Sequence, residues 1–330
     1  MNTIWVGFFL KFRRFIRLPV SVMFLLFIST PIIVVAAPIS VPSQARAVGY
    51  DDLTFTSHFS RASVGIAVKP QTGFKWYTWN FFGQLAQPSE LKFNADHTLT
   101  LLGGHTGPNG QIATAARING PNDFVGRAFG GGAYIEASLK FSPADVKAAH
   151  YIGHPSFWSM AIENLANYDG FKKKSEHGSS DFMEADFFEY DMSRYLHVNN
   201  VYGGTLHNWF GVWKKTCRHG WCDISTSSPV MYVPRDTNWN LFHSYGFLWV
   251  PATAKRTGYA QFYFDNKPVG KRINWSMCSK AGSSIVTSQS AYCVLDRQHL
   301  VLILGTGMGE PMTVRSVHVF QHSAKSNLLH

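Results

Sequence analysis

Charged residues, cysteine and long apolar runs are all scarce in this sequence. Asp, Glu, Lys and Arg make up 15% of its 330 residues and hydrophobic residues 45%, a balance that argues against intrinsic disorder and against a coiled coil. The formal net charge is +10, but no block of five or more Lys or Arg occurs. Half of the surplus lies in residues 1–47, which hold five basic residues and no acidic one. We therefore expect no nucleic-acid partner.

Sequence motifs of two other reaction classes are missing. The G-x-S-x-G motif, which places a serine nucleophile on a strand-to-helix turn, does not occur. Two glycine-rich pieces, 130–132 and 305–309, do not begin a convincing helix, which argues against phosphate or dinucleotide binding. They are typical of the corners of a β-sheet instead.

The one long apolar run, from Val20 to Val35, follows a basic stretch that ends at Arg17 and precedes the small residues Ala36 and Ala37. This order predicts a signal peptide and short leader within residues 1–47, with the mature chain beginning between about residues 37 and 48. The protein is then secreted or periplasmic. The alternative is an uncleaved N-terminal anchor with the domain outside the cytoplasm, because the run approaches the roughly 20 apolar residues that span a bilayer. We find neither a repeat nor a linker in residues 48–330 and expect one domain there.

The four cysteines form two local pairs, Cys217 with Cys222 and Cys278 with Cys293. In an oxidising compartment this arrangement predicts two disulfide bonds, each closing a loop. Three pairings are formally allowed. A zinc site is an alternative, but neither pair has the two-residue spacing that is typical of one.

Apolar and polar residues alternate along most of the chain after the leader, which predicts half-buried β-strands. Such runs cover 99–102, 134–141, 242–250, 259–264, 300–304 and 313–320. Only Ser142-Pro143 resembles a helix start, with a Ser cap and Pro at the first helical position. Many strands and few helices predict an all-β sandwich or jelly roll.

Residues 181–191 hold five of the chain's 20 acidic residues between aromatic residues that favour a strand. In a regular strand Glu184 and Asp186 share one face, whereas Glu189 points to the other. One extra residue at Phe187 or Phe188, a β-bulge, would align all three carboxyls on one face. The alternatives are a solvated edge strand or a calcium site, since hard cations also collect carboxylates.

Such a row of carboxyls suits hydrolysis of a glycosidic bond with retention of configuration. That reaction needs two carboxyls roughly 5–5.5 Å apart, one to attack and one to protonate, and it needs no cofactor. A third acid between these two carboxyls can orient one of them and help to keep the protonation states of the two different.

The segment Glu184-Ala185-Asp186-Phe187-Phe188-Glu189 resembles the bulged Glu-x-Asp-x-x-Glu signature of glycoside hydrolase family 16. Four further segments resemble that family in the same order: 132–140, Pro155-Ser156-Phe157-Trp158, Gly204-Thr205-Leu206-His207, and Phe242-His243-Ser244-Tyr245-Gly246-Phe247-Leu248-Trp249. The resemblance implies a concanavalin A-like β-jelly-roll sandwich with a concave substrate cleft. It also implies that Glu184 is the nucleophile, Asp186 its helper and Glu189 the acid/base.

Aromatic rings stack on the apolar faces of pyranose rings, and polar tips bind sugar hydroxyls. We therefore select the candidate substrate-binding residues Glu136, Trp158, His207, Trp209 and Trp213; Trp158 could as well fill the core. The sequence predicts an exported, monomeric, retaining endo-acting β-glycan hydrolase. The resemblance to glycoside hydrolase family 16 implies that its substrate is a β-1,3-glucan, a β-1,3-1,4-glucan or a bacterial exopolysaccharide. The alternatives are a non-catalytic carbohydrate-binding protein and a transglycosylase on the same fold. A structural calcium ion is not indicated.

Overall fold

The computed structural model describes residues 38–67, 69–78, 86–103, 111–119, 123–150, 153–166, 180–213, 221–278, 292–307 and 310–322. Residues Ser40–His330 form one compact unit. This unit begins before residue 48, so the last part of the predicted leader belongs to it. The predicted signal peptide or anchor lies almost wholly outside the described residues. In the part of the chain that is described, no helix is long and apolar enough to cross a membrane.

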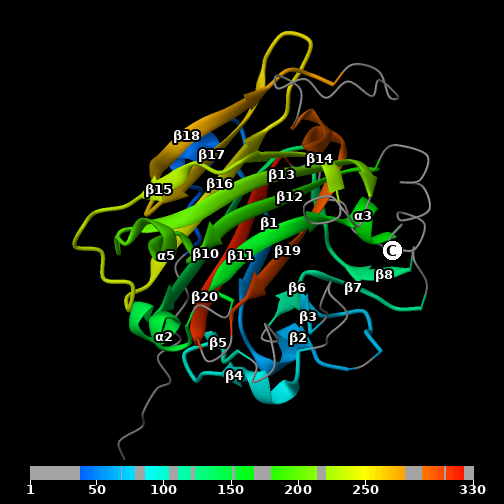
Figure 1. Ribbon diagram of the computed structural model, residues 1–330. Coiled ribbons are helices and arrows are strands. Elements are labelled where there is room, and N and C mark those ends of the chain that lie inside the picture. Colours follow the sequence, from blue (N-terminus) through cyan, green and yellow to red (C-terminus); the bar gives the residue numbers. More distant parts are fainter. Residues whose placement is uncertain are drawn as a thin grey trace, which may run out of the picture. The chain divides into compact units, whose positions relative to one another are not determined.

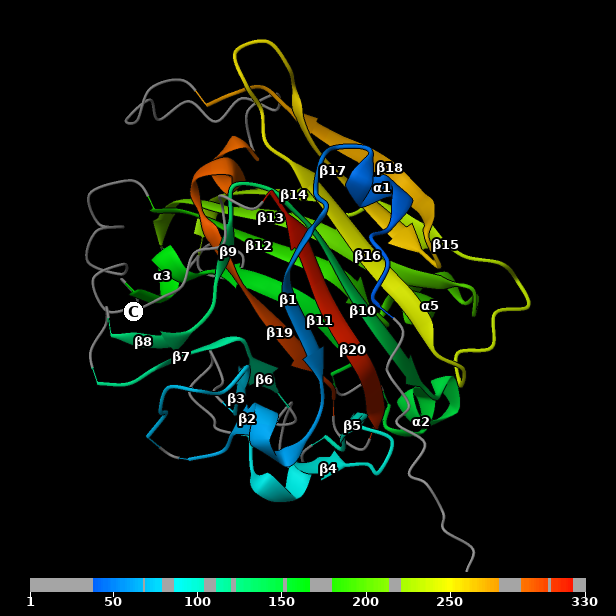
Figure 2. The same ribbon diagram turned by 180° about the vertical axis from the view of Figure 1, so that it is seen from behind.

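The compact unit contains two stacked β-sheets (Figure 1). The smaller has eight described strands in the order β18 (Lys267–Trp275), β17 (Gly258–Phe264), β16 (His243–Val250), β10 (Ala133–Phe141), β20 (Met312–Gln321), β5 (Leu99–Leu101) and β4 (Leu91–Phe93), with β1 (Asp52–His58) beside β20. All its pairings are antiparallel. Seen from behind, β1, β20 and β10 lie side by side (Figure 2).

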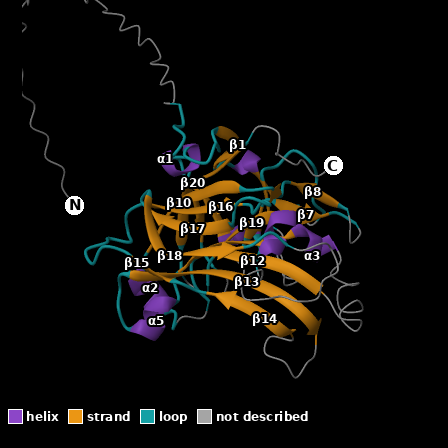
Figure 3. Ribbon diagram, turned by 90° about the horizontal axis from the view of Figure 1, so that it is seen from above, coloured by secondary structure: helices purple, strands orange, loops and turns teal. Residues whose placement is uncertain are grey.

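The larger sheet has ten described strands. Their order is β14 (Trp221–Ser227), β13 (Val201–Trp213), β12 (Ser180–Glu189), β11 (Ser156–Ala161), β19 (His299–Gly305), β6 (Ile112–Ala113), β3 (Trp76–Tyr77) and β2 (Val64–Gly65), with β15 (Val230–Tyr232) beside β13 and β9 (Phe129–Gly130) beside β19. Strands β7 (Ala115–Arg117) and β8 (Phe124–Gly126) form a separate hairpin. The view from above shows β10, β16, β17 and β20 in one layer and β12, β13 and β14 in the other (Figure 3). The predicted all-β jelly-roll sandwich is therefore confirmed.

The helices among the described residues are short, and all but the first, which precedes β1, lie between strands. They are α1 (Ser43–Arg46), η1 (Arg61–Ser63), η2 (Pro88–Glu90), α2 (Pro143–Ala148), α3 (Ile162–Ala166), α5 (Met192–Leu196) and η4 (Cys293–Arg297). Helix α2 begins as predicted, because the Ser142 side chain accepts a hydrogen bond from the backbone N–H of Asp145. The six predicted strands are also present, as β5, β10, β16, β17, β19 and β20.

The core fills the space between the sheets. Strand β10 sends alternate residues into it, and these are Ala133, Ile135, Ala137, Leu139 and Phe141. On the outer face of the same sheet, a separate apolar cluster includes Tyr134, Leu248 and Phe320. Ala45 of α1 packs into this cluster and is fully buried. Residues 40–50 therefore cover part of the outer face of the smaller sheet.

One predicted disulfide is confirmed, between Cys278 after β18 and Cys293 at the start of η4, with the Cα atoms 5.2 Å apart. Next to it, the Asp296 carboxylate accepts hydrogen bonds from the indole nitrogens of Trp249 and Trp275 at 2.9 and 2.8 Å. The other predicted pair, Cys217 with Cys222, falls outside the described residues.

Candidate active site

Strand β12 contains a β-bulge at the predicted place. On β11, the consecutive residues Phe157 and Trp158 face Phe188 and Asp186 of β12, so Phe187 is an extra residue on β12. The register between β12 and β13 shifts at the same place. The bulge predicted from the spacing of the acidic residues is therefore confirmed.

The bulge changes which face of the sheet each residue of β12 occupies. Met183, Ala185, Phe187 and Phe188 are all fully buried in the core between the sheets. Two consecutive buried Phe side chains reverse the alternation of the strand. As a result, Glu184, Asp186 and Glu189 all lie on the outer face of the larger sheet, which we call the site face.

Glu184 is held by an aromatic neighbour on β13. Its Oε2 accepts a hydrogen bond of 2.7 Å from the indole Nε1 of Trp209. The Trp209 ring stacks on Phe182, with centroids 6.1 Å apart and an interplanar angle of 14°. It also stacks on the His207 ring at 5.3 Å. The indole therefore fixes one oxygen of Glu184 and packs beside it as an apolar wall.

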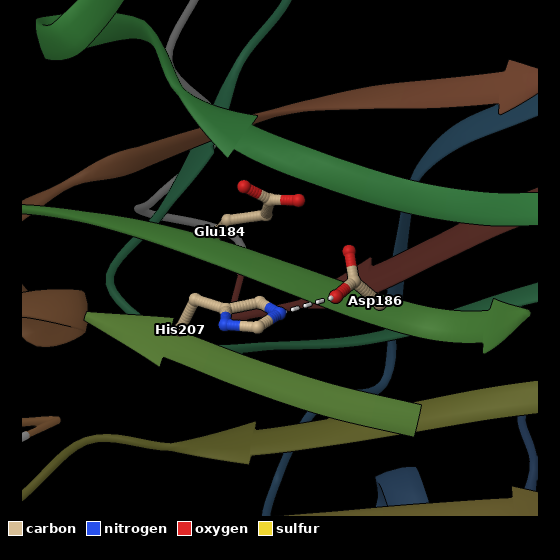
Figure 4. A group of neighbouring side chains, drawn as sticks. All are labelled: Glu184, Asp186 and His207. Atoms are coloured by element: carbon tan, nitrogen blue, oxygen red, sulfur yellow. Dashed lines mark ion pairs between the residues drawn. The ribbon is translucent and has the colours of Figure 1, made fainter. Parts of the chain in front are cut away.

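Asp186 lies between the two Glu residues and faces His207 (Figure 4). The His207 Nε2 is 3.4 Å from the Asp186 Oδ2, and the His207 Nδ1 is 2.9 Å from the Thr226 hydroxyl of β14. One ligand atom each from Glu184, Asp186 and His207 lies within 4.8 Å of the others, a spacing that could hold a metal ion. An imidazole in this set is less suited to calcium, which prefers oxygen ligands.

Glu189 has 24% of its side chain exposed. Its Oε1 is 2.9 Å from the Nε2 of His154, just before β11. Burial lowers the pKa of His154, but the hydrogen bond to Glu189 and the negative charges of Glu189, Asp191 and Glu310 outweigh burial and raise the pKa above its ordinary value. The imidazole thus becomes more readily charged beside three carboxyls.

Burial raises the pKa of Glu184 well above its ordinary value, and the negative charges of Asp186 and Glu189 raise it further. The nearby His207 and the hydrogen bond from Trp209 oppose this shift. The pKa of Asp186 is also raised well above its ordinary value, again by burial first and then by the charges of Glu189 and Asp191. Carboxyls whose pKa values are raised by burial and by each other's charge are typical of functional sites.

The predicted sugar-binding residues have different outcomes. His207 and Trp209 contact the carboxylates, as described above. Trp158 is the strand partner of Asp186 and lies on the site face. It is only 6% exposed, however, and packs in a second apolar cluster. Trp213 pairs with Trp221 through the backbone, and its side chain falls outside what the structure describes.

Glu136 does not belong to the site. It lies on β10 of the smaller sheet, paired with Gly246 and His318, on the face opposite the core. Its Oε2 accepts a hydrogen bond of 3.2 Å from the Tyr134 hydroxyl. The prediction that Glu136 binds substrate is therefore wrong for the site that holds the three acids, because the whole core separates it from them.

Sequence reasoning missed His154 and Glu310. His154 comes just before the Pro155-Ser156 segment, and Ser156 is the strand partner of Glu189. The pairing of β11 with β12 therefore brings His154 to Glu189. Glu310 stands just before β20 and is fully buried. Burial raises the pKa of Glu310 to about 7, and the charge of His154 opposes this shift.

No family model matches the chain, and no curated protein matches its sequence. Among solved structures, the chain is similar to an endo-1,3-β-glucanase from Streptomyces sioyaensis, with 16% identity over 81% of this chain and 95% of that one and a TM-score of 0.47. It is also similar to the carbohydrate recognition domain of Emp46p, with 8% identity over 70% of this chain and 85% of that one and a TM-score of 0.33. A third similar structure is the lectin UEA-II complexed with galactose, with 10% identity over 72% of this chain and 91% of that one and a TM-score of 0.30. Likeness at this level says nothing about the reaction.

Proposed function

We propose that this protein is an exported, retaining endo-β-glycan hydrolase. The observation that carries the proposal is the bulge in β12, which places Glu184, Asp186 and Glu189 in one row on the site face. A row of acids on one strand contributes little to the stability of the fold, since even partial burial of a carboxyl costs free energy. Such an arrangement is typical of catalytic carboxyls.

In the proposed reaction Glu189 donates a proton to the departing glycosidic oxygen while the Glu184 carboxylate attacks the anomeric carbon. Glu189 then takes a proton from water, whose oxygen attacks the same carbon and releases Glu184. Trp209 orients Glu184 by its hydrogen bond, and His154 orients Glu189. The resemblance of the Glu184–Glu189 segment to glycoside hydrolase family 16 supports the same roles.

The proposed substrate is a β-1,3-glucan, a β-1,3-1,4-glucan or a bacterial exopolysaccharide that crosses the site face. The flat rings of Trp209 and His207 beside Glu184 favour a pyranose chain. The basic and apolar N-terminal segment supports export to the periplasm or medium, or anchoring with the domain outside the cytoplasm. We propose a monomer.

A second candidate is a carbohydrate-binding protein that does not turn its ligand over. The observation that favours it is the burial of Glu184 and Asp186, which raises the pKa of both carboxyls and so favours their neutral forms. A neutral carboxyl binds a hydroxyl well but does not attack an anomeric carbon. A transglycosylase would use the same residues and give longer oligosaccharides at high substrate concentration.

A panel of polysaccharides with product analysis tests the proposal, with proton NMR of the first anomer formed. We expect shorter oligosaccharides with retained configuration. Glu184→Ala should abolish hydrolysis without unfolding the protein, since a carboxyl on the site face contributes little packing. Glu189→Ala should be milder on aryl glycosides, whose good leaving groups need less protonation. Binding without cleavage would favour the second candidate, and an inverted anomer would contradict the proposed mechanism.

A further inference from the structure

One imidazole and two carboxyls share a small patch of the site face. Glu184 of β12 is the direct strand partner of His207 on β13, and Asp186 lies two residues further along β12 on the same face. The three side chains therefore come from two neighbouring, hydrogen-bonded strands, which fix their positions more precisely than a loop does. Figure 4 shows the His207 ring and the Asp186 carboxyl directed at each other, with Glu184 beside them.

The spacing of these groups suits a metal ion with tetrahedral coordination. Zinc holds nitrogen and oxygen ligands at about 2.0–2.1 Å, so two ligands of one tetrahedron are about 3.4 Å apart. The His207 Nε2 lies 3.4 Å from the Asp186 Oδ2. The Glu184 carboxyl offers an oxygen within 4.8 Å of the ligand atoms of the other two. Its long side chain can close the remaining distance by a change of rotamer.

The neighbours of these groups leave metal-binding atoms available. A metal-binding imidazole usually donates its other ring N–H to a fixed partner, and that hydrogen bond sets the tautomer. The His207 Nδ1 has such a partner, the Thr226 hydroxyl at 2.9 Å. A proton on Nδ1 leaves the lone pair of Nε2 directed at Asp186. In the same way, Trp209 donates to the Glu184 Oε2, which leaves Oε1 for a metal ion.

Asp186 lacks the partners that a buried carboxyl normally has. Its side chain is 3% exposed, and among the residues that the structure describes only His207 makes a polar contact with it. Buried carboxylates are usually paired with a positive charge, surrounded by hydrogen-bond donors or bound to a metal ion. A dication between Asp186 and His207 would supply the missing partner. The His207 side chain is 24% exposed, so the position can be reached from solvent.

The mixture of one nitrogen and two oxygen ligands selects the class of ion. Calcium and magnesium are bound by oxygen ligands, whereas zinc accepts a His nitrogen together with Asp or Glu oxygens. Three protein ligands are enough for zinc when water or another molecule takes the fourth position. Copper(II) and nickel(II) also bind imidazole, but they favour square-planar arrangements over tetrahedral ones.

We propose that Glu184, Asp186 and His207 bind a zinc ion, and that the ion inhibits the protein by occupying its nucleophile. A bound zinc ion takes the Glu184 lone pair that the proposed reaction directs at the anomeric carbon, and it keeps the sugar ring off the same patch. The inhibition rests on the proposed function, whereas the zinc site rests on the three side chains alone.

Calorimetric titration of the chelator-treated protein with zinc chloride tests the site. We expect one ion per chain in the tightest class of sites. His207→Gln removes a ligand and should weaken that binding by about 100-fold or more. Thr226→Val removes the partner that holds the His207 ring and should weaken it by about tenfold. Thermal melts without zinc verify that both variants are folded.

His299→Gln is the matched control for the imidazole. The His299 Nδ1 lies 2.7 Å from the Glu163 Oε1, so this ring also faces a carboxyl, but it belongs to no group of three ligands among the described residues. Its substitution should leave the zinc affinity within about twofold of the native value. Native affinity in His207→Gln, or an equal loss in His207→Gln and His299→Gln, would overturn the site.

Hydrolysis assays test the inhibition separately. On a β-glucan, zinc should raise the apparent KM with kcat unchanged, because ion and substrate compete for Glu184, and a chelator should reverse the effect. The inhibition constant should rise in Thr226→Val by the same factor as the calorimetric Kd. Zinc binding with no effect on hydrolysis, or with an increase in rate, would overturn the inhibition. Zinc binding by a protein that hydrolyses no glycan would support the site and contradict the proposed function, and hydrolysis without zinc binding would do the reverse.

Discussion

The outer faces of the two sheets each bury a carboxyl beside an aromatic hydrogen-bond donor. On the larger sheet, Trp209 donates to Glu184 at 2.7 Å, and on the smaller sheet Tyr134 donates to Glu136 at 3.2 Å. Burial is the main cause that raises the pKa of both carboxyls. By these local criteria the two sites resemble each other.

Their surroundings differ. Glu184 has Asp186 and Glu189 on its own strand, and their charges raise its pKa further. Beside Glu136, the Tyr134 hydroxyl accepts a hydrogen bond of 2.7 Å from Gln44, which belongs to the segment that covers this face. A raised pKa therefore does not by itself indicate a catalytic group, whereas several acids aligned on one strand do.

The strongest test of this difference is the same substitution on both faces. We expect Glu184→Gln to lower kcat/KM on a β-glucan by about 10³-fold or more, equivalent to about 4 kcal/mol of transition-state stabilisation. Glu136→Gln should stay within about threefold of the native rate, because the amide oxygen can still accept the Tyr134 hydrogen bond. Initial rates and thermal melts of both variants would decide. Similar losses in both would remove the distinction between the two faces.

The sequence predicted the row of acids better than it predicted their neighbours. Within residues 181–191, the alternation of Phe and acidic residues indicates which positions face the core. The same segment also shows that a bulge is needed to bring Glu189 to the face of Glu184 and Asp186. Glu136 was misplaced because alternation tells which residues face away from the core, but not which sheet a strand joins. That depends on pairing with residues more than a hundred positions away, such as Gly246 and His318.

The cover on the smaller sheet should matter for stability and not for activity. Ala45 is fully buried against that face, so Ala45→Asp forces a charge into an apolar cluster. We expect the free energy of unfolding to fall by about 2–3 kcal/mol, with kcat/KM unchanged in the folded protein. Ser43→Asp, at an exposed position of the same helix, is the control. Denaturant melts measure the loss; a drop in kcat/KM would mean that this face takes part in function.

Glu310, near the site, should make stability depend on pH. Its carboxyl is fully buried, and burial raises its pKa to about 7, while the charge of His154 and a hydrogen bond from the Gly307 backbone oppose the shift. In the unfolded chain the pKa returns to about 4.3, so the folded state binds the extra proton between these values. Stability contributed by that proton is present below about pH 4 and is lost as pH rises through about 7.

Glu310→Gln should therefore be more stable than the native protein by about 1–3 kcal/mol at pH 8 and equal to it at pH 4. Thermal melts across this range measure the effect. Asp52→Asn, which changes an exposed acid on β1, should give a curve parallel to that of the native protein. Parallel curves for Glu310→Gln would contradict the prediction.

The smallest expected effect is a shift of the pH profile of hydrolysis. After burial, the negative charge of Asp186 is the largest cause that raises the pKa of Glu184. Asp186→Asn removes that charge, so the pKa of Glu184 should fall and the acid limb of kcat/KM should move to lower pH, in addition to any loss of rate. Glu136→Gln should leave the limb where it is. If the acid limb of kcat/KM moved to higher pH in Asp186→Asn, a group other than Glu184 would control that limb.

The bulge in β12 also has a consequence for how the chain folds. If β12 paired one residue out of step, Glu184 and Asp186 would point between the sheets in place of Met183 and Ala185. Each unpaired carboxylate transferred into that interior would cost several kcal/mol. The acids proposed for catalysis therefore also act against misregistered strand pairing, and a variant that neutralises them loses a safeguard against misfolding together with its activity.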